Sequence, residues 1–126
     1  SREALERCRP NVDLLAQMDS LHDFNQLACF TLEPYTDGAT AVVRMFAPLH
    51  GVYEDPATGR NAACLATYLR AHDIVGECGD EWLTLDQGYS MYRPSKLFIR
   101  ANGSGNAIDV QIGGQCVEVI RGTLSL

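Results

Sequence analysis

Residues 51–69 read GVYEDPATGRNAACLATYL, a loop that runs directly into a helix. Asp55 can cap this helix by accepting a hydrogen bond from one of its first backbone N–H groups, and Pro56 suits the first helical position. A later start is also open, with Thr58 as the cap and Gly59 allowing a ligand close to the backbone. In either case the first turn presents free N–H donors and partial positive charge. The stretch therefore predicts an anion-binding site at a helix start.

The helix after this loop is apolar on all sides. Between residues 62 and 69 only Thr67 is clearly polar. A helix that is hydrophobic all round is usually buried all round, and this one is too short for a membrane span, which needs roughly 20 apolar residues. We expect a central helix enclosed by a curved sheet, with its N-terminus opening into a site.

Composition is that of an ordinary globular domain. The chain has 126 residues, 46% of them hydrophobic and 21% charged, which is enough for one compact unit spanning 1–126. A net charge of −6 and the absence of a Lys/Arg run argue against nucleic acid or an anionic membrane surface as partner. A small anionic ligand remains compatible, because local donors rather than net charge would hold it.

Cysteine usage favours a reducing compartment. The five cysteines are scattered, and no C-x-x-C occurs; they are Cys8, Cys29, Cys64, Cys78 and Cys116. Reduced thiols in a cytoplasmic protein, without a structural zinc site, are the expected state. The opening residues 1–7 are charged and no apolar segment follows, so no secretory signal peptide is expected. Cys64 is expected to be a small residue of the core.

Hydrophobic periodicity and turn residues predict an α+β fold. Helices are expected at residues 2–8, 11–18 and from the motif to 71–73. Asp37-Gly38 is a turn signal that joins two strands into a hairpin, and glycines 76 and 79 start the connection after the central helix. Further turns are expected at 102–106 and 113–114. The expected strands are 24–32, 40–47, 81–86, 96–101, 107–112 and 116–121.

Several short motifs occur in a specific order along the chain. They are RMFAP at 44–48, EDPATG at 54–59, QG at 87–88 with Met91, RPS at 93–95, VQIGG at 110–114 and GTL at 122–124. Together they resemble the signature of the phenazine-biosynthesis PhzF-like family. The resemblance implies the diaminopimelate-epimerase-like fold, in which each of two lobes is a barrel-like mixed sheet around a central helix. It also implies an active site between the lobes, at the N-termini of the two helices.

The resemblance further implies an isomerase or epimerase that moves a proton on a small carboxylate metabolite, with neither cofactor nor metal. This chain is similar to the C-terminal lobe, whereas the family's catalytic glutamate belongs to the other lobe. We therefore expect activity only when the chain is paired with a second lobe, either in a homodimer or with another PhzF-like lobe. The alternative is a non-catalytic small-anion-binding or assembly module that kept the fold and lost the reaction.

The candidate site residues follow from the motif. Asp55 is either an acid/base group at the cleft or simply the helix cap, and Gly59 either contacts a ligand or only permits close packing. After EDPATG the family commonly has serine and alanine, where this chain has Arg60 and Asn61. Arg60 would hold an anionic ligand, fill the pocket or point into solvent. The residues predicted to bind substrate are Thr58, Gly59, Arg60 and Asn61.

Other titratable residues have simpler interpretations. His50 lies in the loop before the motif, where a histidine is more often a surface residue than a catalytic one. His22 and His72 are expected at the surface without a role. Arg93 is placed either at a strand entry or at the interface between lobes.

Overall fold

A six-stranded mixed sheet forms the body of the protein. The computed structural model describes residues 1–75, 81–104 and 107–125. The strands are β1 (Leu27–Thr31), β2 (Ala41–Ala47), β3 (Val52–Asp55), β4 (Leu83–Gln87), β5 (Ser95–Ser104) and β6 (Ala107–Gly114). Their order is β1-β2-β4-β5-β6, with β3 paired to the far end of β2; β2 and β4 are parallel, and the other pairs are antiparallel.

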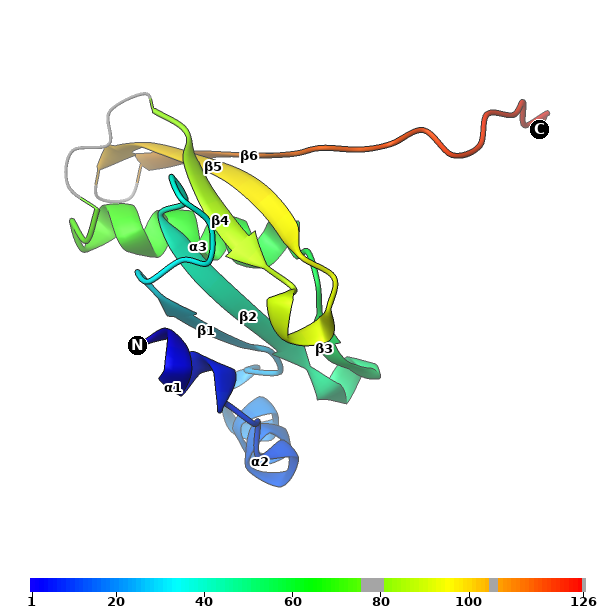
Figure 1. Cartoon of the computed structure of the whole chain (residues 1–126). Coiled ribbons are helices and arrows are strands. Elements are labelled where there is room, and N and C mark those ends of the chain that lie inside the picture. The colour runs from blue at the N-terminus through cyan, green and yellow to red at the C-terminus, as the bar shows by residue number, and fades with distance from the viewer. Residues whose placement is uncertain (76–80, 105–106, 126) are drawn as a thin grey trace.

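The sheet curls around helix α3 (Gly59–Ala71), as Figure 1 shows, while helices α1 (Arg2–Glu6) and α2 (Val12–His22) lie near the β1–β2 side. The predicted α+β class, with a barrel-like mixed sheet and a central helix, is confirmed, with the sheet forming a half-barrel. Two short 3₁₀ turns, Pro48–His50 and Tyr89–Met91, carry the chain out of β2 and β4.

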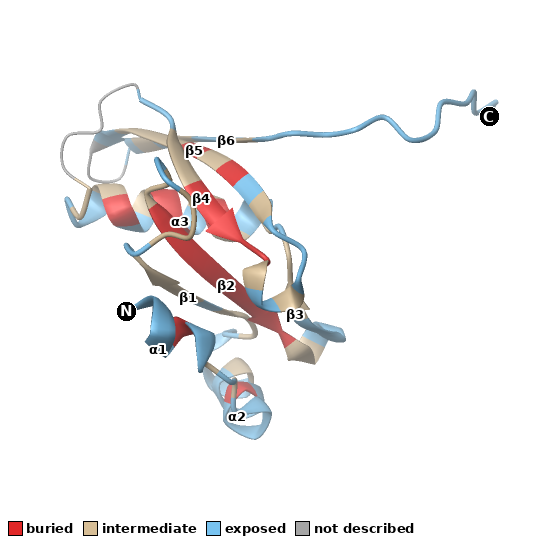
Figure 2. Ribbon diagram, viewed as in Figure 1, coloured by how far each residue is buried: buried red, intermediate tan, exposed pale blue. Residues whose placement is uncertain are grey.

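Strand β2 is the centre of the fold, since all seven of its residues are buried (Figure 2). Alternate side chains of a strand point to opposite faces. Ala41 and Val43 belong to the core against α3, so Val42, Arg44 and Phe46 face the other side, where α1 packs. The core between sheet and helix is completed by Ala62, Leu65, Ala66, Leu69, Leu85, Leu97 and Ile99.

Helix α3 is buried on one face only, so the expectation of burial all round is wrong. Ala62, Leu65, Ala66 and Leu69 are buried, whereas Tyr68 is 47% exposed. Cys64 is also exposed, which corrects its assignment to the core. The half-barrel explains both results, because its sheet covers the inner face of the helix and leaves the outer face uncovered by described residues.

The N-terminal helices and the first hairpin agree with prediction in kind, with shifted ends. Helix α1 is two residues shorter than predicted, and α2 runs four residues further, to His22, with Asn11 as its N-cap. The hairpin of β1 and β2 is confirmed; its Thr36–Ala39 turn is closed by a 3.2 Å hydrogen bond, and Gly38 has φ +79°. The predicted glycine connection at 76 and 79 lies outside the described residues.

Four predictions about strands and turns need correction. β5 runs on to Ser104, through the first part of the turn expected at 102–106, because residues 102–104 pair with β6. β3 forms where a loop was expected, because residues 52–55 pair with the end of β2 across a register shift. β6 continues through Gly113 and Gly114, which were expected to turn, because Phe98 and Leu97 of β5 pair with them. Residues 116–121 form no strand: the segment 115–125 is extended and exposed (Figure 1), without a ladder to any described strand.

None of the helices in the described ranges is both long enough and apolar enough to cross a membrane.

We predict that Leu65→Ala lowers the free energy of unfolding by about 2–5 kcal/mol, because it opens a cavity between α3 and the sheet. The control is the neighbouring exposed position, Cys64→Ala, which should change stability by no more than about 0.5 kcal/mol. Urea unfolding followed by circular dichroism measures both. Equal effects at the two positions would contradict the one-sided burial of α3.

Candidate functional site

The turn between β3 and α3 is held by the amide side chain of Gln87. Gln87 is fully buried at the end of β4. Its Nε2 donates to the backbone oxygen of Asp55 at 2.7 Å and to Thr58 Oγ1 at 3.1 Å, and its Oε1 accepts from the Thr58 backbone N–H at 3.3 Å. One side chain therefore fixes both ends of the turn that precedes the helix.

Asp55 is the last residue of β3, not the cap of α3. Its carboxylate accepts a hydrogen bond from the Thr58 hydroxyl. The helix begins at Gly59, and Thr58 stands at the N-cap position with φ −115° and ψ 100°. Pairing with β2 holds Asp55 in extended conformation, which excludes it from capping. The later of the two predicted starts is thus confirmed, although the Thr58 side chain bonds to Asp55 and Gln87 and makes no cap hydrogen bond.

Gly88 allows three motif segments to meet. Its φ is +82°, and a Cβ placed on it would lie 2.2 Å from the backbone oxygen of Arg93 and 2.9 Å from that of Pro56. These contacts involve backbone, which has little room to move, so a larger residue would displace either the 88–93 turn or the Pro56 turn. The QG, RPS and EDPATG motifs are consequently neighbours in space.

Next to Gln87 in β4, the buried carboxylate of Asp86 holds the loop of the β1–β2 hairpin. Asp86 is fully buried and accepts from the backbone N–H groups of Tyr35 and Thr36 at 2.9 and 2.8 Å, and from the Thr36 hydroxyl. The ring of Tyr35 stacks on that of Tyr89 with centroids 4.1 Å apart. Burial and a hydrogen bond to Glu6 raise the pKa of Tyr35 to about 12, so this phenol stays neutral at physiological pH.

The first turn of α3 presents donors that no described protein atom accepts. The first intrahelical bond runs from the Ala62 N–H to the Thr58 oxygen at 3.0 Å. The backbone N–H groups of Gly59, Arg60 and Asn61 precede it and have no acceptor among the described residues. The side-chain Nδ2 of Asn61 is buried and likewise without a partner there. Donors left in this way mark a place where an anion or a carbonyl group fits.

A cavity of about 320 Å³ lies beside this turn. Arg60, Asn61 and Cys64 line it from α3, and Met45 lines it from β2. The remaining lining residues are Phe24, Gln26, Leu27 and Ala28. The volume is in the range of small-molecule sites, about 300–1,000 Å³. Of the predicted substrate-binding residues, Arg60 and Asn61 line this cavity, whereas Thr58 and Gly59 form the turn at its side.

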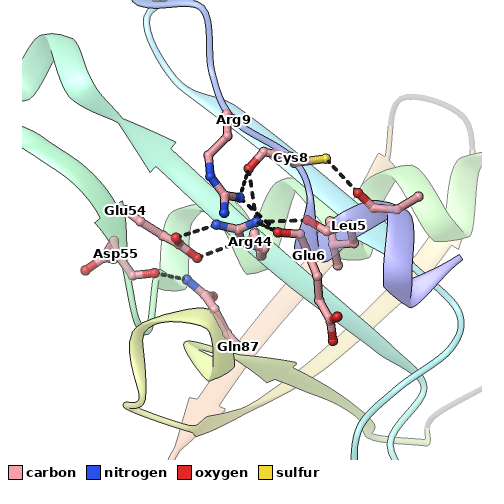
Figure 3. A network of polar contacts seen from close by, with 9 residues as sticks. Leu5, Glu6, Cys8, Arg9, Arg44, Glu54, Asp55 and Gln87 are labelled. Carbon is pink, nitrogen blue, oxygen red and sulfur yellow. Dashed lines mark hydrogen bonds and ion pairs between the residues drawn. The ribbon is translucent and has the colours of Figure 1, made fainter.

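A buried ion pair joins β2 to β3, the strand that leads into the turn before α3 (Figure 3). Arg44 of β2 and Glu54 of β3 form a two-pronged pair, with Nε–Oε1 at 2.9 Å and Nη2–Oε2 at 2.7 Å, and their side chains are only 6% and 7% exposed. Arg44 Nη1 also donates to three backbone oxygens at the end of α1, those of Leu5, Glu6 and Cys8. The hydrogen bonds to Glu54 raise the pKa of Arg44, so the guanidinium is always charged.

Sequence reasoning identified the turn but missed the residues that hold it. Gln87, Arg44 and Glu54 were all within the quoted motifs, yet nothing in the sequence assigned them a partner. The available signal was a polar residue inside or next to an apolar strand: Arg44 interrupts AVVRMFA, and Gln87 follows LTLD. His22, His50, His72 and Arg93 are exposed. Within the described residues, no group of three or more His, Cys, Asp or Glu could hold a metal ion.

Comparison with known proteins identifies relatives over nearly the whole chain. The family model for phenazine biosynthesis-like proteins matches residues 1–122. Trans-2,3-dihydro-3-hydroxyanthranilate isomerase of Pseudomonas fluorescens is 34% identical over 124 residues, covering 93% of this chain and 42% of that protein. The enzyme of the same name from Pseudomonas chlororaphis is 40% identical over 84 residues, covering 66% of this chain and 30% of that protein. The chain thus spans less than half the length of these curated relatives.

A solved structure shares the fold. The phenazine biosynthesis protein of the PhzF family from Bacillus anthracis superposes with a TM-score of 0.74 at 19% identity, covering 89% of this chain and 38% of that chain.

We predict that Glu54→Ala lowers the free energy of unfolding by about 3–5 kcal/mol, because it leaves the Arg44 charge buried without its partner. Glu3→Ala is the matched control: Glu3 pairs with Arg7 at 2.6 Å, but the two side chains are 81% and 66% exposed, so its loss should change little. Chemical unfolding at pH 7 measures both. Comparable losses for the two variants would contradict the structural role assigned to the buried pair.

Proposed function

The chain belongs to the phenazine biosynthesis-like protein family, and on that premise we propose that it is one lobe of a PhzF-like isomerase. The lobe acts on a small carboxylate metabolite by moving a proton with acid/base side chains, without cofactor or metal, and is active when a second lobe closes the cleft. The observation that carries the proposal is the first turn of α3, whose N–H groups have no acceptor among the described residues and whose Arg60 and Asn61 line a cavity of about 320 Å³.

In this proposal, hydrogen-bond donors at the start of α3 recognise the carboxylate of the ligand. The N–H groups of Gly59, Arg60 and Asn61 converge at the positive end of the thirteen-residue helix α3. The Asn61 Nδ2 adds a buried donor, and the exposed Arg60 guanidinium adds a charge at the cavity wall. A ligand with two acceptor oxygens matches this set better than a neutral apolar ligand. Thr58 contributes through its position at the N-cap.

Asp55 is the proposed acid/base residue. Its carboxylate is half-buried and accepts a hydrogen bond from the Thr58 hydroxyl, while Gln87 fixes its backbone oxygen. A carboxylate held in this way can take a proton from a carbon next to a stabilising group and return it elsewhere on the same molecule. No atom is gained or lost, as an isomerisation requires. The second acid/base group would come from the partner lobe.

Exposed apolar surface supports pairing with another lobe. In α2 the side chains of Leu14 and Leu21 are 54% and 72% exposed, and Phe24 after it is 42% exposed. In the segment 115–125, Val117, Val119 and Ile120 are at least 85% exposed. Surfaces of this kind usually mark an interface. A homodimer is the simplest way for this chain to bring two such lobes together, in the cytoplasm, a compartment in which permanent structural disulfides are rare.

We predict solvent-proton exchange by the paired protein. Trans-2,3-dihydro-3-hydroxyanthranilate, the compound named for the relatives, and other small carboxylates are incubated with the protein in D₂O and followed by NMR. Asp55→Asn should slow deuterium uptake by about 100-fold or more, because it removes the proton acceptor.

The matched control is Asp109→Asn, an exposed carboxylate on β6, which should exchange at the wild-type rate. Absence of exchange in the dimer, or an Asp55→Asn variant as fast as wild type, would exclude catalysis by this site.

The non-catalytic alternative has one observation in its favour: Arg60 and Asn61 stand where the family commonly has small residues. A binding module would take up small carboxylates without exchange and would lose this binding on Arg60→Ala. Binding accompanied by Asp55-dependent exchange would exclude this alternative.

Light scattering tests whether the chain forms a homodimer. We predict a particle of twice the 13.8 kDa chain mass, and we expect Leu21→Asp to dissociate it, because a charge at this exposed position opposes apolar contact. Gln17→Asp, on the same helix and also exposed, is the control and should leave the dimer intact. A monomer at high protein concentration, or equal behaviour of both variants, would contradict a homodimer through α2.

A further inference from the structure

Two cysteines far apart in the sequence meet on the outer face of the sheet. Cys29 lies in β1 directly opposite Arg44 of β2. Residues directly opposite in an antiparallel pair have side chains on the same face, with Cβ atoms about 4.5–5.5 Å apart. Arg44 faces α1, because its guanidinium binds the backbone oxygens at the end of that helix. Cys29 therefore points toward α1 and away from α3.

Cys8 is brought to the same place by the same arginine. Its backbone oxygen accepts from Arg44 Nη1 at 3.1 Å, and its thiol donates to the backbone oxygen of Ala4 at 3.5 Å (Figure 3). Helix α1 packs against β1, so Cys8 and Cys29 both lie beside the Arg44 side chain on this face, and each thiol acts electrostatically on the other. Both are half-buried, whereas Cys64 and Cys116 are exposed. Among the described cysteines, these two form a pair of neighbouring thiols.

We propose that Cys8 and Cys29 are a site of reversible oxidation, at which a hydroperoxide converts the two thiols into a disulfide that ties the end of α1 to β1. In the first step the Cys8 sulfur attacks the peroxide, forming a sulfenic acid and releasing one molecule of water or alcohol. In the second step the Cys29 sulfur attacks the Cys8 sulfur, the S–S bond forms, and a second water leaves. The peroxide is reduced by two electrons and the thiol pair is oxidised by two.

The surroundings set the rate and the consequence of this reaction. Burial and the adjacent Cys8 raise the pKa of Cys29 to about 11, so its sulfur is protonated at pH 7 and bond formation accelerates as the pH rises. The bond would close a loop that contains α2 and anchor α1, whose end supplies three acceptors to Arg44. Such a bond restricts the unfolded chain, so it raises the unfolding temperature. A thiol reductant reverses both effects.

The test uses the full chain with Cys64, Cys78 and Cys116 replaced by serine. After treatment with hydrogen peroxide and blocking of free thiols with iodoacetamide, we expect the mass to fall by two hydrogens with no alkylation, and dithiothreitol to restore both reactive thiols. Further replacement of Cys8 or Cys29 by serine should abolish the loss of hydrogens. The unfolding temperature should rise on oxidation by roughly 10 °C.

Peptide mapping of the wild-type chain gives a second readout if the serine background folds poorly. Trypsin does not cut before Pro10, so residues 8–44 form one tryptic peptide that contains both cysteines. A further cut at Asp13, Asp19 or Asp23 should leave two fragments joined until reductant is added. Overoxidation to sulfinic acid without a bridge, bridging only between chains, or a rate that falls with rising pH would each overturn the proposal.

Discussion

The buried guanidinium of Arg44 is the interaction on which the arrangement of the site depends. It lies in the middle of β2, the strand that is buried along its whole length. A charge there is tolerated only when it is fully paired, and Arg44 meets that condition with Glu54 on β3 and three backbone oxygens at the end of α1. One side chain thus fixes β3 to the sheet and closes the C-terminal end of α1. The position of Asp55, next to Glu54, follows from this pairing.

Gln87 connects the end of β3 to the start of α3. Its amide holds the Asp55 oxygen and the Thr58 N–H, so the three residues between β3 and α3 have little conformational freedom. Gly88 lets the Arg93 and Pro56 backbones approach where any side chain would collide. Packing therefore fixes the direction of the first N–H groups of α3. Fixed donors of this kind stabilise charge without rearrangement, which is what proton transfer on a carboxylate requires.

The sequence predicted those features that local patterns encode. The hairpin around Asp37-Gly38 and the alternating strand at 107–112 were readable from turn residues and periodicity, and Gly59 was one of the two helix starts that the sequence left open. The resemblance added the barrel-like sheet around the helix, and the structure shows that this sheet closes only to a half-barrel. Pairings between distant residues were not readable: β3 exists because β2 accepts it, and residues 116–121 have strand composition but no described neighbour to pair with. Burial of α3 was overestimated because composition does not show how far a sheet closes.

The residues that hold the site illustrate the same limit. Arg44 and Gln87 appeared as polar residues in apolar surroundings, a signal that something must pair with them, but the partners lie about ten and thirty positions away. The most direct test of the central claim is an NMR titration of the chain with a small carboxylate, following the backbone amides. We predict saturable shifts at Gly59, Arg60 and Asn61, reduced by Arg60→Ala. Shifts distributed over the surface, with none at the start of α3, would contradict it.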